Sequence, residues 1–467
     1  MLNRLNRLNR PDTIAKLLSH KYRRSGRSKR RLAILSLAVS FAAAHVAVAN
    51  MVEVIGTSGT NGTPSNPNGG PGGNATANAS GNTDTSNTAI AIGGAGGYGL
   101  GAGATGGNGG VATASASGIS TNGSDLFVTV QQTGGNGGYG KSIANGGKGA
   151  DSILATTIGG TDNAITGATT GKLTLTQNAT GGNSGGTNRG GNAGTAGNAS
   201  SIMDLTFSGT GAPSYLIGNS NAYAGSGGYS RSPGNEAANF GQAGTANTQI
   251  NLTNVGNVSA TATANNRNQY GSNINFYGST GDHAGNGNTA TATAGGISTG
   301  TGSAGGYSRV TANATGSSGG RGLTNGFYGP SSFGNGGAGG NATAQAFGSN
   351  ASSNSVTVTA SAIGGAGGGG WGAAISGNGG IATASASGMS TGGGPVNVTA
   401  NATGGSGGYG GYGAVGGNGA NSIMTNAVFG ATTGKLTLTQ NATGGNSGGT
   451  HGGGVADRAG GDSNGVG

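Results

Sequence analysis

The sequence predicts an all-β chain in which units of about 40 residues stack into a repeat β-solenoid of the parallel β-helix kind, joined by glycine-rich arcs. Three observations predict this fold: long segments recur along the chain, apolar and polar residues alternate within them, and 112 of the 467 residues are glycine. Only 7% of the residues are charged and 5% are aromatic, which is far from the composition of an ordinary packed enzyme. A largely disordered glycine-rich chain is the alternative fold class.

The first 49 residues have the pattern of an export leader. They hold eleven Lys or Arg and one acidic residue, which accounts for the whole formal charge of +10. An apolar run from Leu32 to Val48 follows and ends in the small-x-small pattern Ala47-Val48-Ala49 that a signal peptidase cleaves. We interpret residues 1–49 as a signal peptide with a long basic n-region, recognised by the export machinery. An uncleaved anchor and an Arg-rich transit peptide are the alternatives.

The remaining chain is close to neutral, because its ten basic and ten acidic residues cancel. This balance argues against a nucleic-acid partner, since nucleic-acid binding depends on basic side chains at phosphates. Cysteine is absent, which excludes disulfides, thiolate metal sites and thiol nucleophiles. We expect a secreted or cell-surface protein with a Gly/Asn/Pro/Thr linker at 50–72 and glycine-rich β repeats over 73–467.

Self-comparison reveals a duplicated block. The string GATTGKLTLTQNATGGNSGGT occurs unchanged at 167–187 and at 430–450, and VATASASGIS from Val111 returns as IATASASGMS from Ile381. A shorter period of roughly 40 residues is visible inside the block. Repeats of this length suit an architecture in which each unit buries its small side chains against its neighbours.

Each clear unit contains two segments with period-two alternation, which indicates strands with one buried and one exposed face. The first is rich in small residues, as in 112–116, and the second is more apolar, as in 126–130. In the second strand we expect Leu or Val to point inward and Thr outward. The inward pairs are Leu173 and Leu175, Val356 and Val358, Val396 and Val398, and Leu436 and Leu438. Alanine gives the first strand a thin face at Ala262 and Ala264 and over 290–294, 342–346 and 382–386.

Glycine tracts such as GGAGGYG from Gly93 and GGNGGYG from Gly134 follow the second strand. They are not ordinary helices, because glycine costs about 1 kcal/mol relative to alanine at each helical position. We expect arcs or turns that join the strands. Bundled glycine helices of the polyproline-II type are a looser alternative, since their triplet period is only local in the sequence.

The sequence does not support catalysis, a cofactor or a small-molecule substrate. Beyond the leader it holds two histidines, His283 and His451, and ten scattered carboxylates. The window 146–154 matches the calcium nonapeptide of RTX β-rolls, with Asp151 as the anionic ligand. The match stands alone and its duplicate carries Asn421 instead, so Asp151 is only a weak calcium candidate and no metal site is predicted.

Six aromatic residues each follow a glycine pair or a glycine, at what we take to be equivalent points of their units. One interpretation is a stacked ladder that anchors each arc, and the other is a row of exposed rings that binds sugars. The candidate binding residues are Tyr98, Tyr139, Tyr229, Tyr307, Trp371 and Tyr409.

The outward threonines have two interpretations as well. Regular Thr-x-Thr ladders can order water on a flat ice-binding face, but threonine is also a favourable strand residue. Repeated Asn-Ala-Thr triplets are N-glycosylation sequons, although asparagine also forms side-chain ladders at stacked positions. They begin at Asn74, Asn178, Asn313, Asn341, Asn401 and Asn441.

The long basic leader, the missing cysteine and the Ala/Thr/Val strand units broken by GGxGG tracts resemble glycine-rich bacterial surface proteins. The passengers of autotransporter and filamentous adhesins are the nearest in pattern. The resemblance covers 73–467 and implies a secreted β-helical stalk for adhesion or matrix formation. The GGAGG and GGNGG tracts also resemble mycobacterial PE-PGRS proteins, but no helical PE module precedes them. No C-terminal barrel strands are recognised, so we expect either a fragment or a released protein.

These features together predict a secreted or cell-surface structural or adhesive repeat protein without catalytic activity. Its expected partners are host or matrix glycans, or further copies of itself. The alternative function is a carbohydrate- or ice-binding repeat module that uses the aromatic or threonine rows. A disordered glycine-rich matrix polymer is a third hypothesis.

Overall fold

A computed structural model describes residues 50–157, 163–188, 190–231, 240–266, 284–322, 334–451 and 463–466. The predicted leader and His283 lie outside these ranges. The described chain is almost entirely β, with one short 3₁₀ turn at Gly302–Ala304. The predicted all-β class is therefore confirmed, and every strand pairing in a sheet is parallel, as in a β-solenoid.

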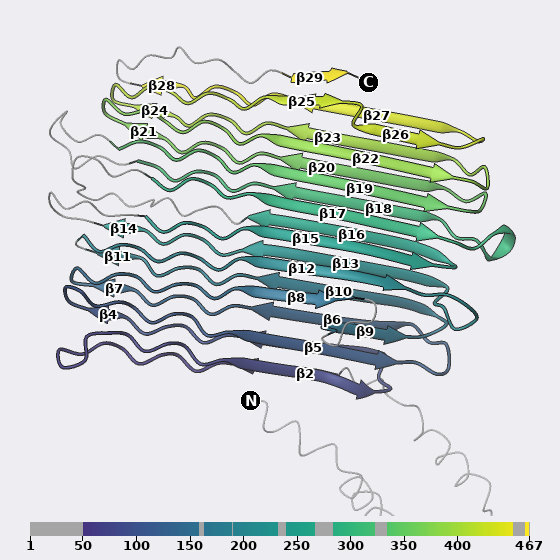
Figure 1. Ribbon diagram of the computed structural model, residues 1–467, viewed down its shortest axis with the longest axis horizontal. Coiled ribbons are helices and arrows are strands. Elements are labelled where there is room, and N and C mark those ends of the chain that lie inside the picture. Colours follow the sequence, from purple (N-terminus) through teal and green to yellow (C-terminus); the bar gives the residue numbers. More distant parts are fainter. Residues whose placement is uncertain are drawn as a thin grey trace, which may run out of the picture. The chain divides into compact units, whose positions relative to one another are not determined.

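The largest sheet receives one strand from each unit along the chain, and its ten strands follow the order of the sequence (Figure 1). Successive strands pair without a register shift, so equivalent positions form straight columns across the sheet. The strands are β1 (Asn50–Ile55), β3 (Ser86–Ile92), β6 (Leu126–Thr133), β10 (Lys172–Thr180), β13 (Tyr215–Ala224), β16 (Asn257–Asn266), β18 (Ser308–Thr315), β20 (Val356–Ile363), β23 (Val396–Thr403) and β27 (Leu436–Thr443).

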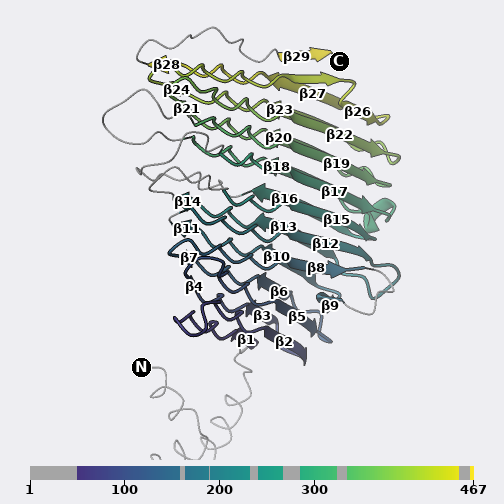
Figure 2. The ribbon, with the colours of Figure 1, turned by 60° about the vertical axis from the view of Figure 1, so that its left-hand side comes forward.

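A second layer packs against this sheet and is made of the other strand of each unit (Figure 2). It is divided into a seven-stranded and a three-stranded sheet. The seven strands are β8 (Ser152–Thr156), β12 (Ala199–Thr206), β15 (Ala246–Asn254), β17 (Ala290–Ser298), β19 (Ala342–Asn350), β22 (Ala382–Ser390) and β26 (Val428–Ala431). The three are β2 (Ala75–Asn82), β5 (Ala112–Ile119) and β9 (Ile165–Ala168), while β25 (Ser422–Thr425) pairs with β29 (Ser463–Val466).

The core lies between the two layers and consists mainly of alanine, valine and leucine. The predicted inward pairs of the second strand are buried in β10, β20 and β23, and the residue between each pair, a threonine in β10 and β20 and Asn397 in β23, faces outward. Leu436 and Leu438 of β27 differ, since 42% and 44% of their surface stays exposed. Their sequence is identical to that around Leu173 and Leu175, which β13 covers from the next unit. Burial is thus supplied by the following unit.

Two of the sequence assignments differ from the structure. Ala262 and Ala264 lie in β16 of the ten-stranded sheet instead of the first strand of a unit. Alanine rows line both layers, so alanine content alone does not tell the two strands apart. The interval 50–72, predicted as a linker, contains β1, which pairs with β3 along its whole length. The paired strands therefore begin before residue 73.

The glycine tracts also differ from the expectation of arcs. After seven of the second strands, β3, β6, β10, β13, β20, β23 and β27, they run as extended segments to a short two-residue strand and back (Figure 1). The short strands form one sheet of β4 (Gly99–Leu100), β7 (Gly140–Lys141), β11 (Thr187–Asn188) and β14 (Ser230–Arg231), and another of β21 (Gly370–Trp371), β24 (Gly410–Gly411) and β28 (Thr450–His451).

Candidate binding surfaces

Hydrogen bonds between the glycine tracts repeat every third residue. In the outgoing tract 364–370, the first residue of each triplet donates to the outgoing tract of the next unit and the second donates to the returning tract of the preceding unit. The bonds are Gly364 N–H to Thr403 O (2.9 Å), Gly367 N–H to Ser406 O (2.8 Å), Gly365 N–H to Gly340 O (2.8 Å) and Gly368 N–H to Gly337 O (2.8 Å). This triplet pattern is that of bundled polyproline-II-type glycine helices, the looser alternative of the sequence analysis.

Close approach of the backbones explains the glycines. A Cβ atom on Gly368 would lie 1.6 Å from the carbonyl oxygen of Gly320, and one on Gly405 would lie 2.0 Å from that of Gly365. The third residue of each triplet points away from the neighbouring tracts and accepts other side chains, as Ala366 and Ser406 illustrate. The GGx pattern is therefore a packing requirement.

Asparagine at the third position completes the hydrogen bonding. The backbone N–H of the third residue in a triplet faces outward. It donates a hydrogen bond to the side-chain oxygen of an asparagine at the equivalent position one unit earlier. Asn378 accepts from the N–H of Asn418 at 3.0 Å, and Asn341 accepts from that of Ile381 at 2.8 Å. Further acceptors are Asn61, Asn68, Asn74, Asn108, Asn136, Asn145, Asn183, Asn198, Asn286 and Asn335.

Asp151 occupies one of these asparagine positions. Its Oδ1 accepts the N–H of Asn198 at 2.7 Å, which is the bond that asparagine makes in the other units. Within the described ranges, no group of three or more His, Asp or Glu side chains could hold a metal ion. The aspartate that suggested calcium thus has a structural partner in the ladder.

The six predicted aromatic residues do not form one row. Tyr98, Tyr139, Tyr229 and Tyr409 share one column of the outgoing tracts, since the carbonyl of each accepts the N–H of the residue that follows the equivalent position in the preceding tract. Three members of that column, Gly186, Gly369 and Gly449, lack a side chain, so the column is interrupted. The Tyr139 and Tyr229 rings meet across Gly186 with centroids 5.8 Å apart, and the Lys141 Nζ lies 3.5 Å from the Tyr98 ring centroid.

Tyr307 and Trp371 lie elsewhere. Tyr307, directly before β18, packs against Tyr215, the first residue of β13, with ring centroids 5.5 Å apart, and burial there raises the pKa of Tyr307. Trp371 is in β21, and its register partner in the next unit is Gly411, two residues after Tyr409. The prediction of six equivalent positions is wrong for these two. Trp371 instead contacts Tyr412, which the sequence analysis did not single out, with ring centroids 4.9 Å apart.

The outward face of the ten-stranded sheet is regular and nearly uncharged. One column contains half-buried threonine in every unit from β3 to β27 except β13, where Asn219 takes its place. The column is Thr88, Thr129, Thr176, Asn219, Thr261, Thr311, Thr359, Thr399 and Thr439. The adjacent column is rich in asparagine, and Asn441 donates to Asn401 at 2.8 Å.

Lys172 is one of the few charged residues on this face. Its Nζ lies 3.3 Å from Oδ2 of Asp125, and its backbone N–H donates to Oδ1 of the same carboxylate at 3.2 Å. That backbone bond, followed by the bond from the ammonium, holds the pKa of the Asp125 carboxyl below its usual value. Both side chains are exposed enough for solvent to screen the pair.

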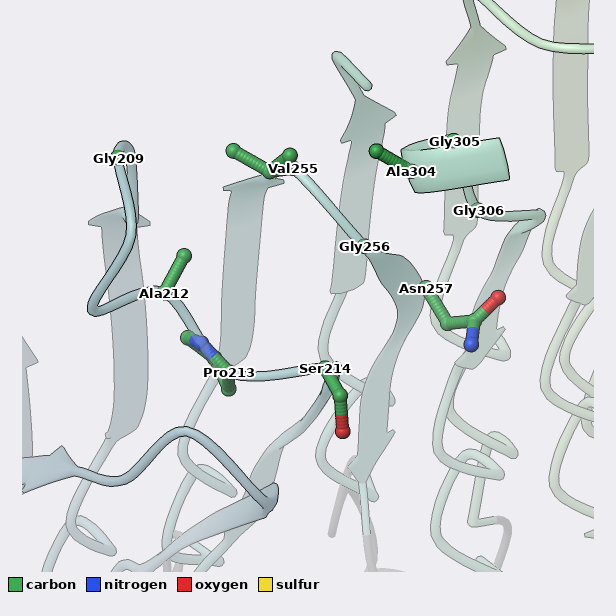
Figure 3. Close-up of a pocket in the computed structure, with 10 residues that line it drawn as sticks. All are labelled: Gly209, Ala212, Pro213, Ser214, Val255, Gly256, Asn257, Ala304, Gly305 and Gly306. Atoms are coloured by element: carbon green, nitrogen blue, oxygen red, sulfur yellow. The ribbon is translucent and has the colours of Figure 1, made fainter. Parts of the chain in front are cut away.

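Two recesses in the described surface offer little chemistry. A recess of about 300 Å³ lies among the turns that join the two layers and is lined by Pro213, Ser214, Asn257 and neighbouring small residues (Figure 3). It contains no titratable side chain, and Oδ1 of Asn257 already accepts the N–H of Tyr307. This recess lacks the acids, bases and nucleophiles that catalysis requires.

A larger recess of about 490 Å³ marks the break between β5 and β8. The buried Gln132 bridges the break, because its Oε1 accepts the N–H of Ala114 and its Nε2 donates to the carbonyl of Ile153, both at 3.2 Å. Lys148 and Asp151 line the recess without an ion pair between them among the described contacts. We interpret this recess as a seam in the sheet.

The chain matches no family model, no curated protein and no solved structure. Among the described residues, no helix has the length and apolar character needed to cross a membrane.

Proposed function

We propose that the protein is a secreted or cell-surface scaffold with a structural or adhesive role and no catalytic activity. The carrying observation is that ten successive units each contribute one strand, in register, to a single parallel sheet. Such a β-solenoid-type stack grows by one strand spacing, about 4.8 Å, for each unit. Its length and surface, which every unit extends, would then perform the function.

The side chains that recur in most of the described units support this proposal. They are the inward alanines and valines of the core, the outward threonines of the sheet and the asparagines of the ladder. Each has a packing or hydrogen-bonding role in joining one unit to the next. The export leader predicted for 1–49 and the resemblance to adhesin passengers support a location outside the cytoplasm.

Two measurements test the scaffold proposal. The full chain and a variant lacking 1–49 would be expressed in a bacterial host, and the cell surface and medium would be assayed for the protein. We expect export of the full chain only, and increased aggregation or surface attachment of the exporting cells. Full-length protein retained in the cytoplasm would contradict the location, while export without any gain in attachment would contradict the adhesive role.

Ice binding is a second candidate function, and the threonine column favours it. Threonine hydroxyls and methyls recur at one strand spacing on a face with few charges, so the face is periodic and complementary to an uncharged, periodic surface. The asparagine ladder beside it fixes side chains in advance, which lowers the entropic cost of binding.

Inhibition of ice recrystallisation by the purified full chain tests this candidate. The double variant Thr311→Tyr, Thr359→Tyr would place two bulky rings above the flat outward face and keep ice from contacting it. We expect at least a tenfold loss of inhibitory potency, equivalent to about 1.4 kcal/mol. Gln345→Tyr, on the outward face of β19, is the matched control and should retain potency. Absence of inhibition by the parent protein, or equal potency of the double variant, would reject the candidate.

A further inference from the structure

Three aromatic side chains cluster where the outgoing and returning glycine tracts meet in the last three described units. Trp371 is in β21, Tyr412 follows β24, and His451 is in β28. The ring centroids of Trp371 and Tyr412 are 4.9 Å apart at 42°, and those of Tyr412 and His451 are 6.3 Å apart at 89°. We call these three residues the aromatic cluster. It spans three adjacent units in one line.

The backbone fixes the positions of these rings. Gly411 pairs with Trp371 on one side and with His451 on the other, and a Cβ atom on Gly411 would lie 2.4 Å from the Trp371 ring. The indole therefore lies across the glycine backbone. The N–H of Tyr412 donates to the carbonyl of His451 at 2.9 Å, which ties the second ring to the third unit.

The Tyr412 side chain is costly in two ways. It is 63% exposed, so it buries little apolar surface, and its φ of 48° lies in the left-handed region that non-glycine residues rarely adopt. Backbone strain of this kind costs about 1–3 kcal/mol and tends to occur at binding sites. Folding alone gives no reason for a tyrosine here.

The duplicated block provides an internal comparison. In its first copy, Ser142 has a φ of 53° at the place of Tyr412, and Leu100, Lys141 and Asn188 stand where Trp371, Gly411 and His451 stand in the second copy. The short strands of the two copies pair in the same way. The turns therefore form without the rings, which separates the cluster from the requirements of the fold.

Sugars are the ligand class that this chemistry suits. The apolar C–H face of a sugar ring stacks on an exposed aromatic ring, while the Tyr hydroxyl and the indole N–H donate to sugar oxygens. The three side chains supply no carboxylate, ammonium or guanidinium, so they favour an uncharged ligand. A single-stranded nucleic acid would need basic residues along its phosphates as well as rings. A linear array over three units suits an extended chain of sugars.

We propose that Trp371, Tyr412 and His451 form a binding site for a neutral oligosaccharide. The site deepens the adhesive role proposed above by giving it a ligand class. Tyr409, three residues before Tyr412 in the outgoing tract, is 48% exposed.

Trp371 is the only tryptophan in the sequence, so tryptophan emission, excited at a wavelength that tyrosine does not absorb, reports on this site alone. The full chain would be titrated with cellotetraose, chitotetraose, maltotetraose and mannotetraose. We expect a saturable change in emission with at least one of them, and protection of the indole from acrylamide quenching. The absence of any saturable change at millimolar sugar would overturn the proposal, as would binding of single-stranded DNA or an unrelated peptide in place of all four sugars.

Two substitutions copied from the first block test the assignment of residues. Tyr412→Ser and His451→Asn introduce the residues found at 142 and 188, which the same turns accept. Each should weaken sugar binding by about tenfold or more, corresponding to 1.4 kcal/mol. Tyr223→Ser, on the outward face of β13, is the control and should leave affinity unchanged. Unaltered affinity in Tyr412→Ser would overturn the site. A parent protein without a β-type far-UV circular dichroism spectrum would instead reject the scaffold proposal.

Discussion

Replacement of Gly405 by alanine tests the packing of the glycine tracts. Gly405 donates to Gly380 O at 2.9 Å, and Gly380 donates to Gly365 O at 2.8 Å. The new methyl would lie 2.0 Å from Gly365 O, so the tracts must separate at this point. Loss of these two backbone bonds costs about 1 kcal/mol each, and overpacking adds about 1–3 kcal/mol. Alanine also reduces the conformational entropy of the unfolded chain, which offsets about 0.4–1 kcal/mol of this loss in the free energy of unfolding. The expected net destabilisation is about 3 kcal/mol.

Hydrogen exchange at the Gly380 amide measures this effect, because it reports local opening in a repeat protein whose parts can unfold separately. Urea titration followed by far-UV circular dichroism supplies the global free energy of unfolding. Ser406→Ala is the matched control, since Ser406 is an exposed third-position residue of the same tract and should change stability by less than about 0.5 kcal/mol. Equal stability of the Gly405 and Ser406 variants would refute the close-packing argument.

Three further predictions follow from the same contacts. Leu175→Ala should cost about 2–5 kcal/mol in the free energy of unfolding, whereas Leu438→Ala, in an identical local sequence but 44% exposed, should cost clearly less in parallel urea titrations. Asp151→Asn should keep the bond to Asn198 and leave the thermal midpoint unchanged with or without calcium, while a calcium-dependent midpoint in the parent protein alone would restore the metal hypothesis. The hydrogen bond from the Lys172 backbone N–H, followed by the bond from its ammonium, holds the folded pKa of Asp125 below the unfolded value of about 3.9. The charged carboxylate therefore stabilises the fold above the unfolded pKa, and this effect is lost as the pH falls through the folded pKa. Asp125→Asn should flatten the acid side of the stability profile, and an unchanged slope would contradict the assignment.

The strands could be predicted from the sequence because their side chains alternate with period two. The buried face of a strand can be predicted from this alternation without knowledge of any partner strand, as in β10 with Leu173 and Leu175 and in β20 with Val356 and Val358. The parallel register then follows from stacking equivalent units. Alanine is less informative, since it lines both layers, and this is why Ala262 and Ala264 were assigned to the wrong strand.

The glycine tracts could not be predicted in the same way. Their conformation depends on hydrogen bonds to tracts of neighbouring units. The need for glycine arises from carbonyl oxygens that are 10 residues away for Gly367 and 48 residues away for Gly368, and this spread follows no fixed sequence spacing. Counting from glycine pairs also misplaced Trp371, because the run of four glycines before it shifts the ring two places beyond the Tyr409 position. The contact between Trp371 and Tyr412 depends on the stacking of units and has no local sequence pattern.

Spin-label distances along the threonine column test the central claim, that successive units stack strand upon strand, most directly. The chain has no cysteine, so paired labels at residue 129 and at residues 359, 399 or 439 would be the only thiol sites. The register places these pairs five, six and seven strands apart. Narrow distributions near 24, 29 and 34 Å, rising by about 4.8 Å per unit, are the predicted result. Broad distributions, or distances that do not rise by one strand spacing per unit, would contradict the stack.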